Sequence, residues 1–247
     1  MTKVSDRLNR LSESATLAMA RMSRELKAEG KDVIALSLGE PDFDTPDFIK
    51  QSAKNAIDNN FSHYTPVPGL LELRQAICNK FKRDNKLDFT PDQIVVSTGA
   101  KQSIANVCLS ILNPGDEVLL PAPFWVSYAD IINLAEGIPI QISSSVENDF
   151  KVSPSQIEEK ITEKTKLLMF SSPCNPSGSV YTKEELTDIA TMLEKYPNIY
   201  IISDEIYEHI NFTNTHFSIG SIPFLKDRVI TVNGVSLSNA LSSAVSS

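Results

Sequence analysis

The sequence predicts an α/β fold: a mostly parallel sheet flanked by helices, with part of a small N-terminal domain. Through residues 94–232, short apolar runs of four or five residues alternate with helical patterns, which is the order of βαβ units. Most of these runs are apolar along their length, as in strands buried on both faces. Composition agrees, because 41% of the 247 residues are hydrophobic and 22% are charged, which is typical of a folded globular protein.

The first 85 residues are expected to contain three helices, one strand and a loop. These are a helix from Ser14 to Glu29, a strand at Val33–Ser37, a helix opened by Thr45 and Pro46, a loop over 63–69, and a helix from Leu70 to Asn85. The first helix is amphipathic and stops at Gly30, as helices commonly do. Thr45 is expected to cap the second helix, with Pro46 at its first helical position. The loop is inferred from its Pro and Gly content.

From residue 94 onward the pattern predicts the sheet and its connecting helices. The expected strands are Ile94–Ser97, Glu117–Leu120, Ile138–Ile142, Leu167–Phe170, Ile199–Ile202 and Val229–Val232. The expected helices are Lys101–Leu112, Trp125–Ala135, Pro154–Ile161 and Lys183–Glu194. Sheets of this kind bind ligands in the loops at the carboxyl ends of their strands, so those loops are where chemistry is expected.

Charge and hydropathy exclude several classes of function. Lys and Arg total 23 against 31 Asp and Glu, a net charge of −8, whereas nucleic-acid binders usually carry a basic stripe. We therefore expect no nucleic-acid partner. No stretch reaches the roughly 18 apolar residues of a membrane span, and the N-terminus lacks the apolar core of a signal peptide. A cytoplasmic protein without a membrane partner is expected.

Cysteine, histidine and glycine spacing gives no metal or nucleotide motif. The three cysteines stand far apart without a C-x-x-C pair, so neither a disulfide framework nor a zinc site is expected. The three histidines have no metal-binding spacing. Neither G-x-G-x-x-G nor G-x-x-x-x-G-K-[ST] occurs, which removes two common arguments for nucleotide binding.

Two of the strand-exit loops offer a helix start and an aromatic ring. Gly99, Ala100 and Lys101 lie in a small-residue turn that opens a helix, where free N–H groups and the helix dipole favour an anion. An ordinary tight turn has the same composition. Trp125, the only Trp in the chain, follows the next strand and suits stacking on a planar ring. The alternative is a core Trp that closes the sheet edge.

Two later strand-exit loops carry polar side chains. Asn175 lies between Pro173 and Pro176, so a stiff loop aims one amide either at a ligand or only into a structural turn. Asp204 ends an apolar strand, and Tyr207 follows three residues later. A carboxylate buried at that point needs a cationic or donor partner. The alternative is that Asp204 caps a helix.

Seven motifs occur in order along the chain: Leu38–Phe43, Tyr64–Pro66, Thr98–Gln102, Pro123–Tyr128, Ser172–Gly178, Ser203–Tyr207 and Val232–Ser236. Together they resemble the class I aminotransferases that use pyridoxal 5′-phosphate, close to the bacterial aspartate aminotransferase group. The resemblance implies the large domain of a fold-type I pyridoxal-phosphate transferase, incomplete here. It also implies transfer of an amino group from an L-amino acid of the aspartate or glutamate type to a 2-oxoacid, by a homodimer when full length.

The resemblance assigns five residues to the cofactor phosphate. Gly99, Ala100 and Lys101 lie in the loop that holds it, and Ser236 adds a hydroxyl. Tyr64 reaches the phosphate bound by the partner subunit of the homodimer.

The resemblance assigns other residues to the cofactor ring and the substrate. Trp125 stacks on the pyridine ring, and Asp204 pairs with its nitrogen, where a carboxylate keeps the ring protonated. Asn175 and Tyr207 hydrogen-bond the phenolic oxygen of the ring. Gly39 contacts the amino-acid substrate through its backbone, together with Trp125 and Asn175.

The chain departs from this family at residue 237. In the family, the residue after the equivalent of Ser236 is the lysine that forms a Schiff base with the cofactor, whereas here it is Leu237. A leucine can neither hold the cofactor covalently nor move a proton. The resemblance then gives way to a Ser- and Ala-rich run. These features indicate a truncated chain without its catalytic residue.

The motifs divide the chain into three parts: an N-terminal arm and part of a small domain (1–45), an incomplete large cofactor-binding domain (46–236) and a non-homologous tail (237–247). The first functional hypothesis is an aminotransferase, with prephenate as an alternative acceptor, since enzymes that act on it share these loops. The second is an inactive fragment that only binds cofactor or a partner subunit. An unrelated α/β binding module would require every motif to be coincidental.

Overall fold

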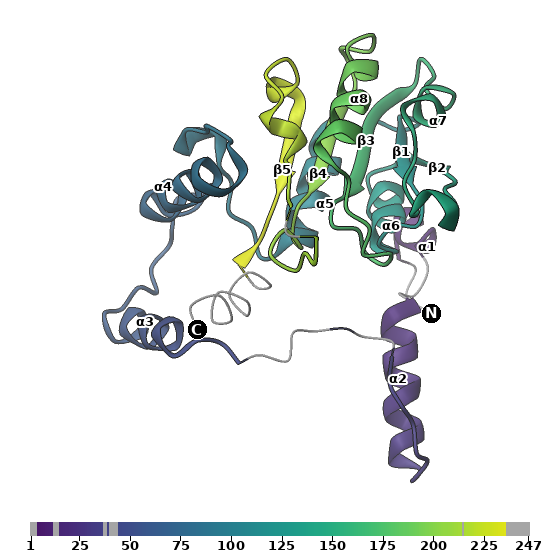
Figure 1. Ribbon diagram of the computed structural model, residues 1–247. Helices are drawn as coiled ribbons and strands as arrows, with labels where there is room; N and C mark the ends of the chain where they lie inside the picture. Colours follow the sequence, from purple (N-terminus) through teal and green to yellow (C-terminus); the bar gives the residue numbers. More distant parts are fainter. Residues whose placement is uncertain (1–3, 12–14, 37–38, 40–43, 214, 236–247) are drawn as a thin grey trace.

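The computed structural model describes residues 4–11, 15–36, 39, 44–213 and 215–235 (Figure 1). Its centre is a five-stranded sheet with the order β2-β1-β3-β4-β5, in which every neighbouring pair is parallel. The strands are β1 (Glu117–Pro121), β2 (Ile138–Ile142), β3 (Thr165–Ser171), β4 (Tyr200–Asp204) and β5 (Val229–Val232). This sheet confirms the predicted α/β class and five of the six strands predicted after residue 90.

Helices precede β1 and connect β1 to β2, β2 to β3 and β3 to β4, and they cover both faces of the sheet (Figure 1). They are α5 (Ala100–Ile111), α6 (Ser127–Leu134), α7 (Pro154–Glu158) and α8 (Lys183–Leu193), within a few residues of the predicted ranges. Leu168 of β3 packs on one face with Leu186 of α8. Leu167 and Met169 pack on the other face with Ile104 of α5. Because successive side chains of a strand point to opposite faces, burial on both faces explains the continuous apolar run.

The remaining elements lie before the sheet and in its connections. They are α1 (Asp6–Asn9), α2 (Ala15–Ala28), α3 (Asp47–Asp58), α4 (Leu71–Lys80), the π-helix η1 (Phe81–Asn85), and the 3₁₀ turns η2 (Pro91–Gln93), η3 (Val146–Asn148), η4 (Ile219–Ser221) and η5 (Lys226–Arg228). Figure 1 shows α2 projecting from the body of the molecule, with α3 and α4 on the side of β5. No helix among the described residues is long and apolar enough to cross a membrane. The domain boundaries at residues 45 and 236 stay predictions.

The predicted strand at Ile94–Ser97 is wrong. This segment lies outside the sheet, because Ile94 is buried against Cys78, Phe81 and Leu87 in a small separate core. The Val96 N–H donates to the carbonyl of Pro68 at 3.0 Å and not to a neighbouring strand. Ile94 is therefore buried by the unit of α4 and η1, whereas Val95 is 66% exposed. Periodicity alone does not distinguish this packing from burial in a sheet.

Two N-terminal predictions also need correction. The described part of the predicted strand Val33–Ser37, residues 33–36, has no regular secondary structure, and its apolar side chains Ile34 and Leu36 are exposed without a neighbouring strand. Residue 37 lies outside the described residues. Helix α3 begins at Asp47, so Pro46 takes the N-cap position that was expected for Thr45, and no side chain caps this helix.

Candidate functional site

The carboxyl ends of the parallel strands bring sequence-distant polar residues to one edge of the sheet. Ser171, the last residue of β3, is aligned with Asp204, the last residue of β4. The Asn175 backbone N–H donates to the Ser171 hydroxyl at 3.4 Å. The loops after β3 and β4 therefore leave the sheet side by side. Ligands of such sheets bind outside the carboxyl ends of the strands, which is where these loops lie.

Asp204 is a buried carboxylate whose two oxygens each accept a hydrogen bond. Tyr128 of α6 donates its hydroxyl to Oδ2 at 2.6 Å, and the Ile206 N–H donates to Oδ1 at 3.2 Å. Burial raises the pKa of Asp204 above its usual value, although both hydrogen bonds oppose this rise. The predicted alternative of a helix cap is wrong, because residues 205–210 form turns and not a helix. The carboxylate is fixed in one orientation at the sheet edge.

Tyr128→Phe is expected to lower the free energy of unfolding by roughly 1.5–3 kcal/mol near pH 7, the usual contribution of a hydrogen bond to a charged group. A carboxyl with a raised folded-state pKa stabilises the fold most below its unfolded pKa and loses that contribution as pH rises through the folded pKa. Without the Tyr128 hydroxyl this pKa rises further, so the deficit is expected to be largest near neutrality and to shrink towards pH 4. Urea unfolding of the unsubstituted chain and of the variant at pH 7 and at pH 4 measures this difference in the free energy of unfolding.

Tyr181→Phe provides the matched control for that measurement. Tyr181 is also buried, but the partner of its hydroxyl is a backbone group and not a carboxylate: the hydroxyl accepts a hydrogen bond from the Val152 N–H at 3.0 Å. Burial raises the pKa of Tyr181 to about 12, so the cost of this substitution should be the same at both pH values. An equal deficit for Tyr128→Phe at both values would contradict the role assigned to the Tyr128 hydroxyl.

An aromatic ring packs against Tyr128, and a cation lies over that ring. Trp125 is half-buried, and its ring meets the Tyr128 ring edge-on with centroids 5.5 Å apart. The Lys101 ammonium lies 4.7 Å from the centroid of the Trp125 ring, within the range of a cation–π interaction. Trp125 packs against the core while part of its surface stays exposed, so the stacking role and the alternative of a core Trp that closes the sheet edge both stay predictions. Trp125 connects Asp204, through Tyr128, to the helix start that carries Lys101.

That helix start has the geometry of an anion site. Gly99 precedes α5 with a φ of +89°, a left-handed conformation that favours glycine. No side chain caps the helix, and the N–H groups of Ala100 and Lys101 belong to the first turn, which has no carbonyl partner within the helix. The dipole of this 12-residue helix and the Lys101 ammonium add positive charge. A phosphate is a suitable ligand for such a site.

Asn175 and Tyr207 form a polar pair on the loops after β3 and β4. The Asn175 amide donates to the Tyr207 hydroxyl at 3.2 Å. Burial raises the pKa of Tyr207, while the hydrogen bond from Asn175 opposes the rise and the charge of Asp204 adds to it. Tyr207 therefore stays protonated at neutral pH and can donate a hydrogen bond. The two motifs that carry these residues were predicted to meet at one site, and the geometry agrees.

Two other predicted residues are described but not joined to this arrangement, and two lie outside the described residues. Tyr64 is fully exposed on the loop between α3 and α4, and no described hydrogen bond joins it to the other site residues. Gly39 is exposed, with no atom within 4 Å of the position of an added Cβ. Ser236 and Leu237 lie outside the described residues. The roles of these four residues stay predictions.

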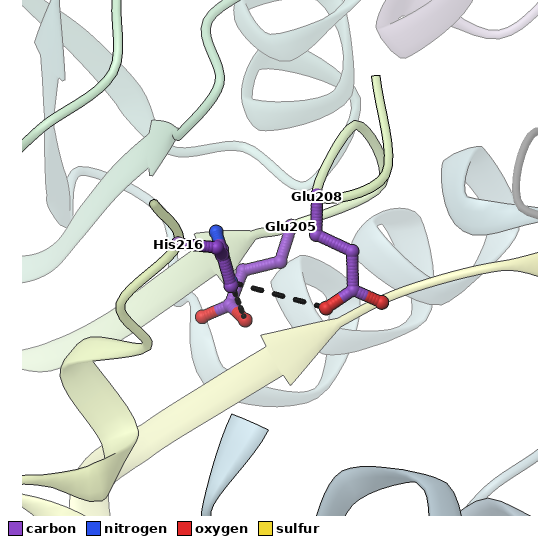
Figure 2. Close-up of side chains that lie close together, drawn as sticks. All are labelled: Glu205, Glu208 and His216. Atoms are coloured by element: carbon purple, nitrogen blue, oxygen red, sulfur yellow. Dashed lines mark hydrogen bonds and ion pairs between the residues drawn. The ribbon is translucent and has the colours of Figure 1, made fainter. Parts of the chain in front are cut away.

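Sequence reasoning missed Tyr128 and a buried polar cluster next to Asp204. The cluster contains Glu205, Glu208 and His216, which Figure 2 shows converging below the end of β4. Tyr128 was inside a recognised motif, but its contact with Asp204 joins positions 76 residues apart. The sequence signal that could have indicated the cluster is the pair Glu205 and Glu208 directly after an apolar strand, because carboxylates buried there need hydrogen-bond donors.

Comparison with known proteins explains this geometry. The model of the family "Aminotransferase class I and II" matches residues 31–244. The chain belongs to this aminotransferase family. It is 48% identical over 241 residues to the aspartate/prephenate aminotransferase of Nitrosomonas europaea, covering 97% of this chain and 61% of that protein. It is also 48% identical to the aspartate/prephenate aminotransferase of Cereibacter sphaeroides, with 96% and 60% covered.

Solved aminotransferase structures share the fold. The aspartate aminotransferase from Rhizobium meliloti superposes with a TM-score of 0.94 at 37% identity, covering 98% of this chain and 61% of that one. The Thermus thermophilus enzyme with maleate gives a TM-score of 0.92 at 38% identity, with 98% and 63% covered. The sheet and its helices are thus the large-domain architecture of the fold-type I transferases. The chain spans about 60% of the length of the curated relatives it matches.

Proposed function

We propose that this aminotransferase-family chain binds pyridoxal 5′-phosphate at the carboxyl edge of its sheet. The observation that carries the proposal is the buried Asp204 carboxylate, which Tyr128 orients at 2.6 Å. Trp125 packs edge-on against Tyr128, and Tyr207 lies close enough for the charge of Asp204 to raise its pKa. A buried carboxylate favours a cationic partner, and a protonated pyridine nitrogen is a cation. Asp204 is thereby the group that keeps the bound ring protonated.

The other residues of the site fit the rest of the cofactor. The start of α5, with Gly99, Ala100 and Lys101, suits the phosphate because it combines backbone N–H groups with a lysine. Trp125 offers a flat face to the ring, and Tyr207 with Asn175 offers donors to the phenolic oxygen. When bound, this cofactor supplies an electron sink for reactions at the α-carbon of an amino acid.

We further propose that the protein moves an amino group from aspartate or glutamate to a 2-oxoacid. The names of its relatives support an acidic donor and leave prephenate as an alternative acceptor. A homodimer is proposed because the fully exposed Tyr64 is free to contact a partner's phosphate site, and Ser236 is proposed to add a hydroxyl to that site. Gly39 is proposed to contact the substrate, and a cytoplasmic location completes the proposal.

A second candidate function is cofactor binding without turnover. Leu237 favours it, because a leucine cannot replace the lysine that the family uses at this position. On this interpretation the cofactor is held only by the non-covalent contacts described above. Both candidate functions require the same cofactor site. Binding of pyridoxal 5′-phosphate therefore tests both, and covalent retention of the cofactor by the unsubstituted chain distinguishes the first from the second.

Leu237→Lys is expected to convert reversible cofactor binding into covalent retention. The chain as written should bind pyridoxal 5′-phosphate, measured by equilibrium dialysis, and lose it on denaturation after borohydride treatment. The Leu237→Lys variant should retain it after the same treatment, with the label on the peptide that contains residue 237. A labelled peptide from the unsubstituted chain, or amino transfer from aspartate to 2-oxoglutarate by that chain, would exclude the second candidate. Failure of both proteins to bind would exclude both candidates.

A further inference from the structure

Two buried carboxylates, Glu205 and Glu208, lie directly beyond β4 (Figure 2). The side chain of Glu208 is only 3% exposed. It accepts hydrogen bonds from the Lys80 ammonium, from the Asn85 amide at 2.6 Å and from the Asn233 amide at 2.8 Å. The Asn85 amide also donates to Glu205 at 2.9 Å. One asparagine therefore joins both carboxylates.

This cluster is closed by the donors of the protein itself. Glu205 also accepts from Ser203 at 3.0 Å and Ser218 at 2.6 Å, and it contacts His216 at 2.9 Å. Although Glu205, Glu208 and His216 lie near enough to share a metal ion, the Lys80 ammonium already supplies a positive charge. Burial alone would raise the pKa of Glu208, but Lys80 and the two amides outweigh it and lower the pKa. Glu208 is therefore an ionised group at neutral pH.

The donors to Glu208 belong to the segments that lead to the proposed phosphate ligands. Lys80 ends α4 and Asn85 ends η1. This unit packs as one small core that includes Ile94, five residues before Gly99. Asn233 is the first residue after β5 and lies three residues before Ser236.

Asn233 is held at both ends of its side chain. Its amide donates to Glu208, and its Oδ1 accepts the Gly234 N–H at 2.7 Å. This pair of bonds sets the direction in which the chain leaves β5. Glu208 thus ties the exit of β5 to the unit that precedes the start of α5, through a single carboxylate.

We propose that Glu208 is a positioning residue for the cofactor phosphate. It ties Asn233, at the exit of β5, to the α4 and η1 unit that precedes Gly99, so that the start of α5 is held in the orientation that receives the phosphate. This inference rests on the proposed binding of pyridoxal 5′-phosphate. It extends that proposal to a residue that contacts neither the ring nor the phosphate.

The test compares pyridoxal 5′-phosphate with pyridoxal, which lacks the phosphate, by quenching of the single Trp. The dissociation constant of pyridoxal divided by that of pyridoxal 5′-phosphate measures how much the phosphate contributes to binding. In Glu208→Gln this ratio is expected to fall about tenfold, the lower end of the effect of losing hydrogen bonds to a charged group. The affinity for pyridoxal should change by less than about twofold on the same basis. Glu158→Gln is the control, because Glu158 also pairs with a lysine, Lys195 at 2.9 Å, but at the surface.

Asn233→Ala keeps the test decisive if Glu208→Gln does not fold. It removes both bonds of the Asn233 side chain, the one to Glu208 and the one from the Gly234 N–H, and leaves the Lys80 and Asn85 contacts of Glu208 in place. The ratio should again fall while the affinity for pyridoxal is kept. Equal losses of affinity for both ligands would mean a purely structural role and would overturn the proposal, as would an unchanged ratio. If the unsubstituted chain binds neither ligand, the proposed function itself fails, which is a different result.

Discussion

Asp204→Asn is expected to weaken the binding of pyridoxal 5′-phosphate about 100-fold, since removing one charge of a buried pair costs about 2–5 kcal/mol. Asparagine keeps the shape of the side chain and an oxygen that can accept from Tyr128, so the orienting hydrogen bond at 2.6 Å has a substitute. What it removes is the negative charge opposite the pyridine nitrogen. The dissociation constant is measured by Trp125 fluorescence near pH 7.

The location of the charge gives this prediction a second signature. Because Asp204 acts on the ring, Asp204→Asn should weaken pyridoxal and pyridoxal 5′-phosphate by the same factor, unlike Glu208→Gln. Asp188→Asn, at an exposed position of α8, removes the same charge from the surface and should leave both affinities unchanged. Wild-type affinity in Asp204→Asn would show that the pairing with the ring nitrogen is wrongly assigned.

Leu168→Ala is expected to lower the free energy of unfolding by about 2–5 kcal/mol, the range for deleting a buried leucine side chain. Leu168 is 1% exposed on β3, the central strand of the sheet, and packs in the core that α8 covers. The cavity would lie inside the packed core between β3 and α8, where the surrounding structure relaxes only partially. Urea unfolding followed by far-ultraviolet circular dichroism measures the change.

The control for Leu168→Ala is the same substitution at an exposed leucine. Leu109 lies on α5 and is 52% exposed, so Leu109→Ala should change the free energy of unfolding by no more than about 0.5 kcal/mol. Similar small effects for both substitutions would mean that the β3 core is not packed as the structure has it.

Most strands of the sheet could be predicted from the local sequence pattern. Which neighbouring segment each apolar run packs against could not. The runs that became β1 to β5 are short, apolar and separated by helical patterns. The run Ile94–Ser97 has the same local character, yet Ile94 is buried against Phe81 and Leu87 of the preceding unit. Which neighbour buries an apolar run is a tertiary property, and periodicity does not carry it.

The site divides in the same way. Gly99, Trp125, Asn175, Asp204 and Tyr207 could be proposed because each follows an apolar run in a recognisable motif. For the last four, parallel strands bring such positions to one edge. Their orientation could not be proposed in this way. It depends on a tyrosine 76 residues from Asp204 and, in the neighbouring cluster, on a lysine 128 residues from its carboxylate. No local sequence pattern contains contacts over such separations.

The strand order has a consequence for folding during synthesis. β1 lies between β2 and β3, and β4 and β5 then add on one side in chain order, so each new strand meets an edge that is already formed. Among the described strands β5 follows β4 in the chain, and until it docks, the N–H and C=O groups along the edge of β4 are unpaired. Such an edge is a template for aggregation, and partly folded chains are most exposed to it. The four-residue strand at Val229–Val232 therefore covers the open edge of β4 in the nascent sheet.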